Sequence, residues 1–212
     1  IELFAALKRG LVKAVWIACT NPAQSLPEQS EVRAALAAAE FVVLQEAYAN
    51  TDTADYADLM LPATTWGEKE GTVTNSERRI THVNAALPAP GEARHDWQIV
   101  VDFAGLLGAR LGNSLTEQLF PYDCPEAIFL EHRESTRGRD LDITGLSYAM
   151  LDSRGPQQWP LAAGANLGRQ RLYADGVFPT ANGRARFVEV EHQPTAEHTD
   201  AARPISLLSG RL

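Results

Sequence analysis

The stretch FVVLQEAYANTDTADYADLMLP, residues 41–62, decides the fold class of this chain. Its first five residues are almost entirely apolar, which is typical of a strand in a parallel sheet that is buried on both faces. TDTADYA, residues 51–57, predicts a short helix, and DLMLP, residues 58–62, predicts another strand. Strand, helix and strand in this order indicate an α/β unit.

The pattern continues on both sides of this stretch. VKAVWIACT, residues 12–20, predicts a strand. A helix is predicted before it, at residues 1–10, and ends at Gly10. A second helix is predicted after it, at residues 30–40, with Ser30 as its cap. HDWQIVVDFAGLLGARLG, residues 95–112, has the apolar spacing of an amphipathic helix. We therefore predict a doubly wound, mostly parallel, Rossmann-like α/β sheet over residues 1–112.

The pattern loosens after Gly112. We expect residues 113–200 to form a helical and irregular extension of the same domain. It would contain hairpins, because residues 171–191 include Asp-Gly and Asn-Gly pairs. The chain starts without Met and stops in an apolar run, so we expect it to be a piece of a larger polypeptide.

Charge and cysteine content exclude several function classes. The chain has 212 residues and a net charge of −8, which argues against a general nucleic-acid binder and against an anionic membrane surface as partner. No apolar run approaches the roughly 20 residues that span a bilayer. The two cysteines, Cys19 and Cys124, belong to no C-x-x-C pair. A reduced, cytoplasmic setting is therefore expected.

Polar side chains follow two of the predicted strands. Asn21 comes after the strand at residues 12–20, and Gln45 and Glu46 end the strand that begins at Phe41. Ligands of doubly wound sheets bind at the carboxyl ends of the strands, and an acidic residue there commonly accepts from ribose hydroxyls. A plain β-turn at Asn21 and a solvated strand end at Glu46 are the structural alternatives. A G-x-G-x-x-G fingerprint is absent.

The stretch LPATTWGEKEGTVTNSERR, residues 61–79, concentrates charge around one cation. Lys69 is suited to a phosphate, although a surface ion-pair cluster would also explain it. Arg78 and Arg79 have the same two interpretations. Asp96 could accept from a purine edge, or it could simply cap the helix at residues 95–112.

Other kinds of catalytic site find little support. Glu68 and Glu70 could be an acid/base pair, but a glycosidase is disfavoured because only Trp66 offers a platform for a sugar. The histidines lack metal-ligand spacing, and G-x-S-x-G is absent.

Together, CTNP, FVVLQEAYANTDTADYADLMLPATTWGEKEGTVTNSERR and PAPGEARHDWQIVVDFAGLLG resemble the molybdopterin oxidoreductases of the dimethyl-sulfoxide-reductase type. The resemblance covers about residues 12–112. GRDLDITGLSYAMLDSRGPQQWP and RLYADGVFPTANGRARFV resemble assimilatory nitrate reductase large subunits. The resemblance implies a molybdenum enzyme that reduces nitrate to nitrite and carries two molybdopterin guanine dinucleotides (bis-MGD). The chain would be part of the domain that binds one of them.

The resemblance also implies roles for particular residues and partners. It implies that this chain contains no catalytic residue and no metal ligand. The iron–sulfur cluster would be bound elsewhere in the parent enzyme. Partners would be the remaining domains of the parent and an electron-donor protein or subunit. Lys69 would offset phosphate or carboxylate charge. Independently of the resemblance, we expect Arg78 and Arg79 to hold the loop in place. The implied cofactor contacts are Asn21, Gln45, Glu46, Lys69, Asp96, Ser209, Gly210 and Arg211. The last three match the turn that opens the next cofactor-binding domain of such enzymes, so residues 201–212 are interpreted as the truncated start of that domain.

Two alternatives remain open at this point. The chain could be a stand-alone doubly wound nucleotide-binding module without redox activity. It could also belong to a formate or other oxyanion oxidoreductase, which shares nearly every motif.

Overall fold

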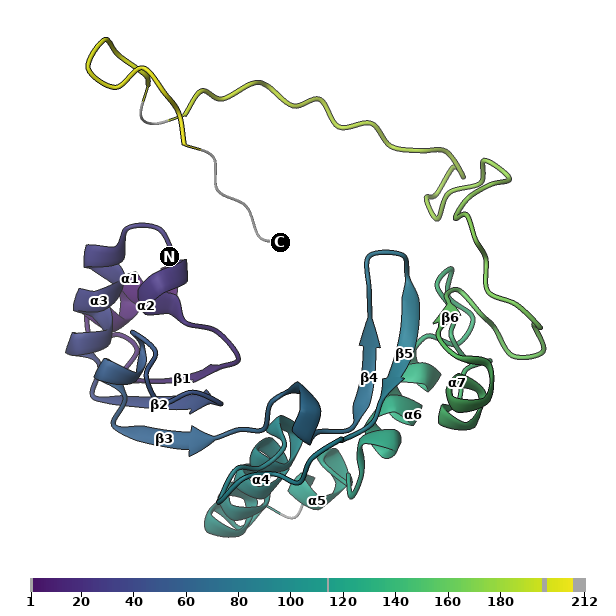
Figure 1. The fold of residues 1–212 in the computed structure, drawn as a ribbon, viewed down its shortest axis with the longest axis horizontal. Coiled ribbons are helices and arrows are strands. Elements are labelled where there is room, and N and C mark those ends of the chain that lie inside the picture. Colours follow the sequence, from purple (N-terminus) through teal and green to yellow (C-terminus); the bar gives the residue numbers. More distant parts are fainter. Residues whose placement is uncertain (1, 114, 196–197, 208–212) are drawn as a thin grey trace. The chain divides into compact units, whose positions relative to one another are not determined.

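Three parallel strands form the sheet that positions the candidate site. In this computed structural model, which describes residues 2–113, 115–195 and 198–207, they are β1 (Ala14–Ala18), β2 (Phe41–Glu46) and β3 (Leu59–Pro62) (Figure 1). The strands lie in the order β1-β2-β3. The predicted parallel α/β arrangement is confirmed for these strands. The short helix predicted between β2 and β3 is a 3-10 turn, η1 (Ala54–Tyr56).

Helices α1 (Glu2–Lys8), α2 (Pro22–Ser25) and α3 (Gln29–Ala38) pack on one face of this sheet. Successive side chains of a strand point to opposite faces, so alternate residues of β1 and β2 meet the helices. The buried residues of this core are Ile17, Ala23, Val32, Leu36, Val42 and Leu44. The predicted cap at Ser30 is wrong: α3 starts at Gln29, after Glu28, which has the left-handed φ of 54°.

Helix α4 (Asp96–Leu111) reaches the opposite face of the sheet. Trp16 alternates with the core residue Ile17 along β1, and its ring meets Phe103 of α4 edge-on, with 4.9 Å between the centroids. The predicted helix is confirmed, and it ends at Gly112 with the left-handed φ of 64°. The predicted N-cap is wrong by one residue. His95 is the cap, and the carboxylate of Asp96 is bonded elsewhere.

A hairpin that the sequence analysis did not predict follows β3. After the 3-10 turn η2 (Trp66–Glu68), strands β4 (Gly71–Thr74) and β5 (Arg79–Val83) pair antiparallel. The short β6 (Gln157–Gln158) adds to β5. The Asn75 side chain closes the hairpin turn by accepting from the N–H groups of Glu77 and Arg79.

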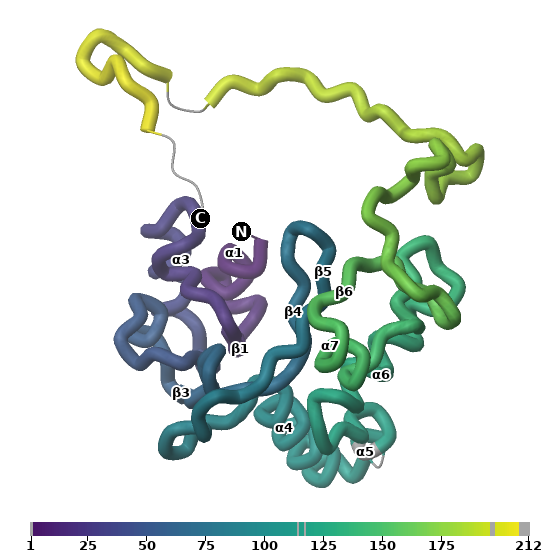
Figure 2. The backbone as a smooth tube through the Cα atoms, turned by 45° about the vertical axis from the view of Figure 1, so that its right-hand side comes forward, coloured from purple at the N-terminus to yellow at the C-terminus, as the bar shows by residue number. Residues whose placement is uncertain are grey.

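A second core lies between this small sheet and helices α6 (Pro125–Ser135) and α7 (Tyr148–Arg154). The short α5 (Leu115–Leu119) connects α4 to this region (Figure 2). The buried residues of the second core are Ile80, Phe129, Ile143, Leu146, Tyr148, Leu151 and Leu161.

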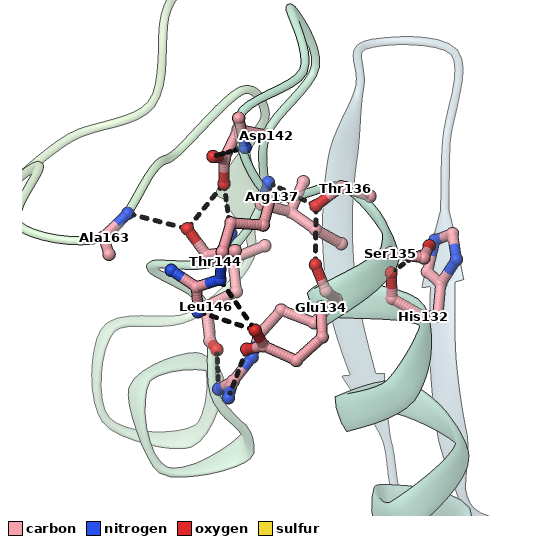
Figure 3. A network of polar contacts seen from close by, with 12 residues as sticks. His132, Glu134, Ser135, Thr136, Arg137, Asp142, Thr144, Leu146 and Ala163 are labelled. Carbon is pink, nitrogen blue, oxygen red and sulfur yellow. Dashed lines mark hydrogen bonds and ion pairs between the residues drawn. The ribbon is translucent and has the colours of Figure 1, made fainter.

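The loop between α6 and α7 is ordered by hydrogen bonds rather than by regular structure (Figure 3). The carboxylate of Asp142 accepts from the N–H groups of Gly138 and Thr144 and from the Thr144 hydroxyl. These bonds hold the pKa of Asp142 below its ordinary value. The Thr144 hydroxyl in turn accepts from the N–H of Ala163. These hydrogen bonds pair polar groups of the loop before α7 with one another and with the N–H of Ala163.

One unit of the fold ends at Gln170, and a second begins at Arg171. In residues 171–195 and 198–207, the described part of the second unit, no helix or strand forms. The predicted hairpin is therefore wrong as a pair of strands. A turn does form, because the Phe178 N–H bonds the Gly183 carbonyl and Tyr173 packs on Phe178. Turn residues alone do not stabilise a two-stranded hairpin.

Arg78 joins the hairpin to the segment that follows β6. Its guanidinium donates to the carbonyl oxygens of Trp159, Arg169 and Gln170, and it lies over the Trp159 ring, 5.5 Å from the centroid. Arg79 makes weaker contacts, with the Glu77 carboxylate at 3.1 Å and the Pro156 carbonyl at 3.4 Å. Both arginines hold this stretch in place, as the sequence analysis suggested, and Arg78 makes more of the contacts than Arg79.

Arg78→Ala should therefore destabilise the chain far more than Arg79→Ala. Loss of the half-buried guanidinium removes charged hydrogen bonds, at a cost of about 1.5–3 kcal/mol. The exposed Arg79 should cost less than about 1 kcal/mol. Urea unfolding of the two variants measures the difference, and equal losses would contradict the assignment.

Candidate functional site

A cleft of about 220 Å³ opens at the carboxyl end of β2. Four separate parts of the chain reach it: Cys19 after β1, the end of β2 with the residues that follow it, the turn η2 with its neighbours, and the first residue of α4. Its lining residues include Cys19, Gln45, Glu46, Trp66, Lys69 and Asp96. The parallel sheet explains the meeting, because neighbouring parallel strands end at the same edge.

The carboxylate of Asp96 lies at the centre of these contacts. Gln45 Nε2 donates to its Oδ1 at 2.8 Å, and Lys69 Nζ donates to its Oδ2 at 2.8 Å. The Cys19 thiol approaches Oδ1 at 3.8 Å. The side chains of Lys69 and Asp96 are 33% and 30% exposed, so the pair is open to a ligand on one side.

The environment shifts two pKa values in the cleft. Burial alone would raise the pKa of Asp96, but hydrogen bonds from Lys69 and Gln45 and the charge of Lys69 outweigh it and lower that pKa. Burial and then the Asp96 carboxylate raise the pKa of the Cys19 thiol. The cleft therefore presents an ionised carboxylate, an ammonium and a neutral thiol.

The two residues that end β2 have different roles. Gln45 is only 2% exposed, and its Oε1 has no hydrogen-bond partner among the described residues. An unpaired buried amide oxygen is costly, so it marks a place where a ligand donor would be favourable. Glu46 instead turns its carboxylate back to its own chain, where it accepts from the N–H groups of Ala47 and Tyr48.

Of the remaining predicted contacts, Asn21 is described and does not line the cleft. Oδ1 of Asn21 accepts from the N–H and hydroxyl of Thr53, and its amide donates to Gln24. These bonds tie the turn after β1 to the loop after β2, which is the structural alternative considered above. Ser209, Gly210 and Arg211 lie outside the described residues.

The sequence analysis assigned no cofactor contact to several residues that line the cleft, Cys19 and Trp66 among them. Cys19 was taken as part of a strand, but it follows β1 with the left-handed φ of 57°, which is uncommon for a residue with a side chain. Trp66 was considered only as a sugar platform, and its side chain is 64% exposed at the rim. A Trp three residues before Lys69 in the sequence was the available signal for Trp66.

The sequence model of the molybdopterin oxidoreductases matches residues 1–106. The chain belongs to the molybdopterin oxidoreductase family. This confirms the resemblance and implies a molybdenum–pterin cofactor for the family.

The chain is similar to curated nitrate reductases and formate dehydrogenase subunits. A nitrate reductase from Synechocystis sp. is 41% identical over the whole of this chain, which spans 29% of that protein. The alpha subunit of an F420-dependent formate dehydrogenase from Methanocaldococcus jannaschii is 36% identical over 95% of this chain and 28% of its own length. The chain thus spans less than a third of the length of these relatives.

Among solved structures, acetylene hydratase from Pelobacter acetylenicus has a TM-score of 0.57 and 20% sequence identity. The match covers 80% of this chain and 23% of that one, and it supports the fold alone. In the described residues, no cluster of three or more His, Cys, Asp or Glu side chains could hold a metal ion. No described helix combines the length and apolarity that a membrane span requires.

Lys69→Met should raise the pKa of Asp96. Two causes that lower it would disappear, while burial, which raises it, would remain. NMR titration of the carboxyl carbon measures the shift. Lys13→Met, which breaks the exposed pair with Glu40, is the matched control and should leave Asp96 unchanged. If the pKa of Asp96 is the same in Lys69→Met as in the wild type, the ion pair does not lower that pKa and the assignment is wrong.

The same shift sets the pH range in which Asp96 contributes to stability. Its folded pKa lies below the ordinary value of about 3.9, so the contribution is present above that pH and is lost as pH falls through the folded pKa.

Proposed function

We propose that this chain is the part of a nitrate reductase that binds one molybdopterin guanine dinucleotide of the bis-MGD cofactor. The observation that carries the proposal is the cleft where Gln45, Lys69 and Asp96 meet at the end of the parallel sheet. The parent reaction would be the two-electron reduction of nitrate to nitrite with transfer of one oxygen atom.

The residues of the cleft fit such a ligand chemically. The free Oε1 of Gln45 can accept from a base or ribose donor. Lys69 offers a compact positive charge suited to a phosphate, in a chain whose overall charge is −8. Asp96 can accept from a purine edge, and the exposed Trp66 ring offers an apolar face. All four residues line the same cleft.

In this proposal the cofactor, when bound, supplies the oxygen-atom and electron-transfer chemistry. The chain's own residues bind and orient it. Lys69 neutralises part of the phosphate charge, and Gln45 and Asp96 select the base. Glu46 shapes the loop at Ala47 and Tyr48 that borders the cleft. Asn21 keeps the neighbouring loop in place through Thr53.

The cleft is too small to be a complete dinucleotide site. Typical ligand pockets measure roughly 300–1,000 Å³, against about 220 Å³ here. We infer that the remaining domains of the parent supply the rest of the site and extend the three strands into a Rossmann-like sheet. Residues 1–112 and 113–200 would then be one cofactor domain and its extension, and 201–212 the start of the next. The 212-residue chain alone should be inactive.

The second candidate is the oxidation of formate, since a formate dehydrogenase subunit is also among the relatives. Nitrate is favoured because the Synechocystis relative is more similar over the whole chain. Turnover of both substrates by the full-length parent, compared at equal molybdenum content, distinguishes the two. In either case an iron–sulfur cluster and an electron-donor protein would lie outside this chain, in a cytoplasmic enzyme.

Asp96→Asn in the full-length parent should lower the content of molybdenum and of guanine nucleotide per polypeptide. The exchange keeps the shape and the bond to Gln45 but removes the charge, and a charged hydrogen bond contributes about 1.5–3 kcal/mol. Metal analysis and nucleotide release by acid hydrolysis measure both contents.

Glu31→Gln is the matched control for this exchange. It makes the same chemical change in the exposed pair of Glu31 with Lys8, and it should keep full cofactor content. Full content in Asp96→Asn would contradict the assignment of the cleft. A fully loaded wild-type parent that does not reduce nitrate would contradict the proposed reaction instead.

A further inference from the structure

The outer edge of β1 has no neighbouring strand within the described residues. The sheet order is β1-β2-β3, so β1 lies at one side of the sheet. At the two ends of the ladder, the carbonyl of Lys13 and the N–H of Cys19 bond to β2. Backbone groups alternate in direction along a strand, so the N–H and C=O groups of Ala14, Trp16 and Ala18 point away from β2.

The other side of the sheet is partly occupied. Ala63, directly after β3, forms a parallel bridge with Arg94 in the segment before α4. The N–H of Arg94 donates to the Pro62 carbonyl at 3.1 Å, and the N–H of Thr64 donates to the Arg94 carbonyl at 3.0 Å. These bonds cover the carboxyl end of β3. In the part of the chain that the structure describes, β1 is therefore the edge that stays open over its whole length.

Helix α4 exposes a row of apolar side chains beside this open edge. Phe103, whose ring meets Trp16 of β1, belongs to the row. Side chains three or four positions apart share one face of a helix. The α4 stripe consists of five side chains at this spacing, each 42–73% exposed: Val100, Phe103, Leu106, Leu107 and Leu111. A single exposed Leu is ordinary, but a contiguous apolar row marks an interaction surface.

The composition of α4 also indicates that more of the helix is covered. After Asp96, its charged residues are Asp102 and Arg110. A helix that is apolar around most of its circumference is typical of a buried position. Trp16 gives an independent sign, because its indole Nε1–H is buried without a partner among the described residues. An unpaired buried donor is costly, and an incoming segment with an acceptor beside Trp16 would remove that cost.

We propose that a strand from the rest of the parent polypeptide, outside residues 1–212, pairs in parallel with the open edge of β1 and packs on the α4 stripe. This inference rests on the proposed function, because it takes the chain as one part of a longer enzyme and names the partner of its sheet. The Synechocystis relative supports the source of the strand, since this chain spans only 29% of that protein.

The fold also indicates the chemistry of the incoming strand. β1 has five residues, so its partner needs a run of about the same length. One face of that run would meet the α4 stripe, and the other would continue the face that α1 and α3 cover. A strand covered on both faces is apolar along nearly its whole length.

A second copy of this chain is the competing occupant. Two copies related by a two-fold axis perpendicular to the sheet would pair β1 with its own equivalent, and the two strands would then run antiparallel. Every described pair in this sheet is parallel, and purely parallel sheets are favoured over mixed ones. A parent strand continues this pattern, whereas a second copy would break it.

The first test is hydrogen exchange in the full-length wild-type parent, resolved to single residues by mass spectrometry. The N–H groups of Ala14, Trp16 and Ala18 should exchange at least about a hundredfold more slowly than in an unfolded peptide, because the added strand accepts from them or shields them. Val15 and Ile17, whose N–H groups face β2, are the internal control and should be protected in either case. Rapid exchange at the three outward positions alone would overturn the proposal.

The second test identifies the occupant by photo-cross-linking. The photo-reactive p-benzoylphenylalanine in place of Leu107 should link, on irradiation of the parent, to a peptide of the same polypeptide outside residues 1–212. The same probe in place of Ala109 is the matched control, because that position is exposed and lies on the opposite side of α4. It should not give this product. Absence of the product from the Leu107 position, or a cross-link between two copies instead, would rule out the parent strand.

Neither measurement depends on turnover, so the two proposals fail separately. A parent that holds the dinucleotide and reduces nitrate, but exchanges rapidly at the outer edge of β1, contradicts the strand pairing alone. A parent with a protected β1 that holds no molybdopterin guanine dinucleotide contradicts the proposed function and leaves the strand pairing in place.

Discussion

The ion pair of Lys69 with Asp96 is the contact on which the candidate site depends. It joins the segment after η2 to the first residue of α4, and Gln45 adds the end of β2 to the same carboxylate. Three segments far apart in the sequence thereby converge at one edge of the sheet. An exposed pair of this kind would contribute little. Here both side chains are about two-thirds covered, and the pair also sets the pKa of Asp96.

The charge that a ligand meets in the cleft differs from the charge of the whole chain. The net charge of −8 describes the whole chain, whereas a ligand in the cleft meets, at short range, the ammonium of Lys69 paired with the Asp96 carboxylate, with the Glu46 carboxylate nearby. Local charge outweighs distant charge because solvent and salt screen interactions beyond about 10 Å. The free Oε1 of Gln45 adds a directional acceptor that surface electrostatics cannot supply.

The two hydrophobic cores hold different segments in place. The first, on the parallel sheet, holds β2 and its polar end in place. The second holds the hairpin through Ile80 and carries α7 with Tyr148 and Asp152. Because Lys69 and Glu70 are adjacent in the chain but face different partners, the short segment before β4 lies between the candidate cleft and His82.

The sequence by itself determined the three parallel strands, helix α4 and the family, because those depend on local apolar periodicity and on motifs that stand close together in the chain. Tertiary structure decided what each polar residue does. Asp96 matches both a helix cap and a ligand contact in sequence, and only the positions of Gln45 and Lys69 distinguish them. Asn21 looked like a ligand contact, yet Thr53, 32 residues away, takes its amide oxygen. The hairpin of β4 and β5 and the pairing of His82 with Asp152, 70 residues later, likewise depend on contacts between distant segments, which no local pattern encodes.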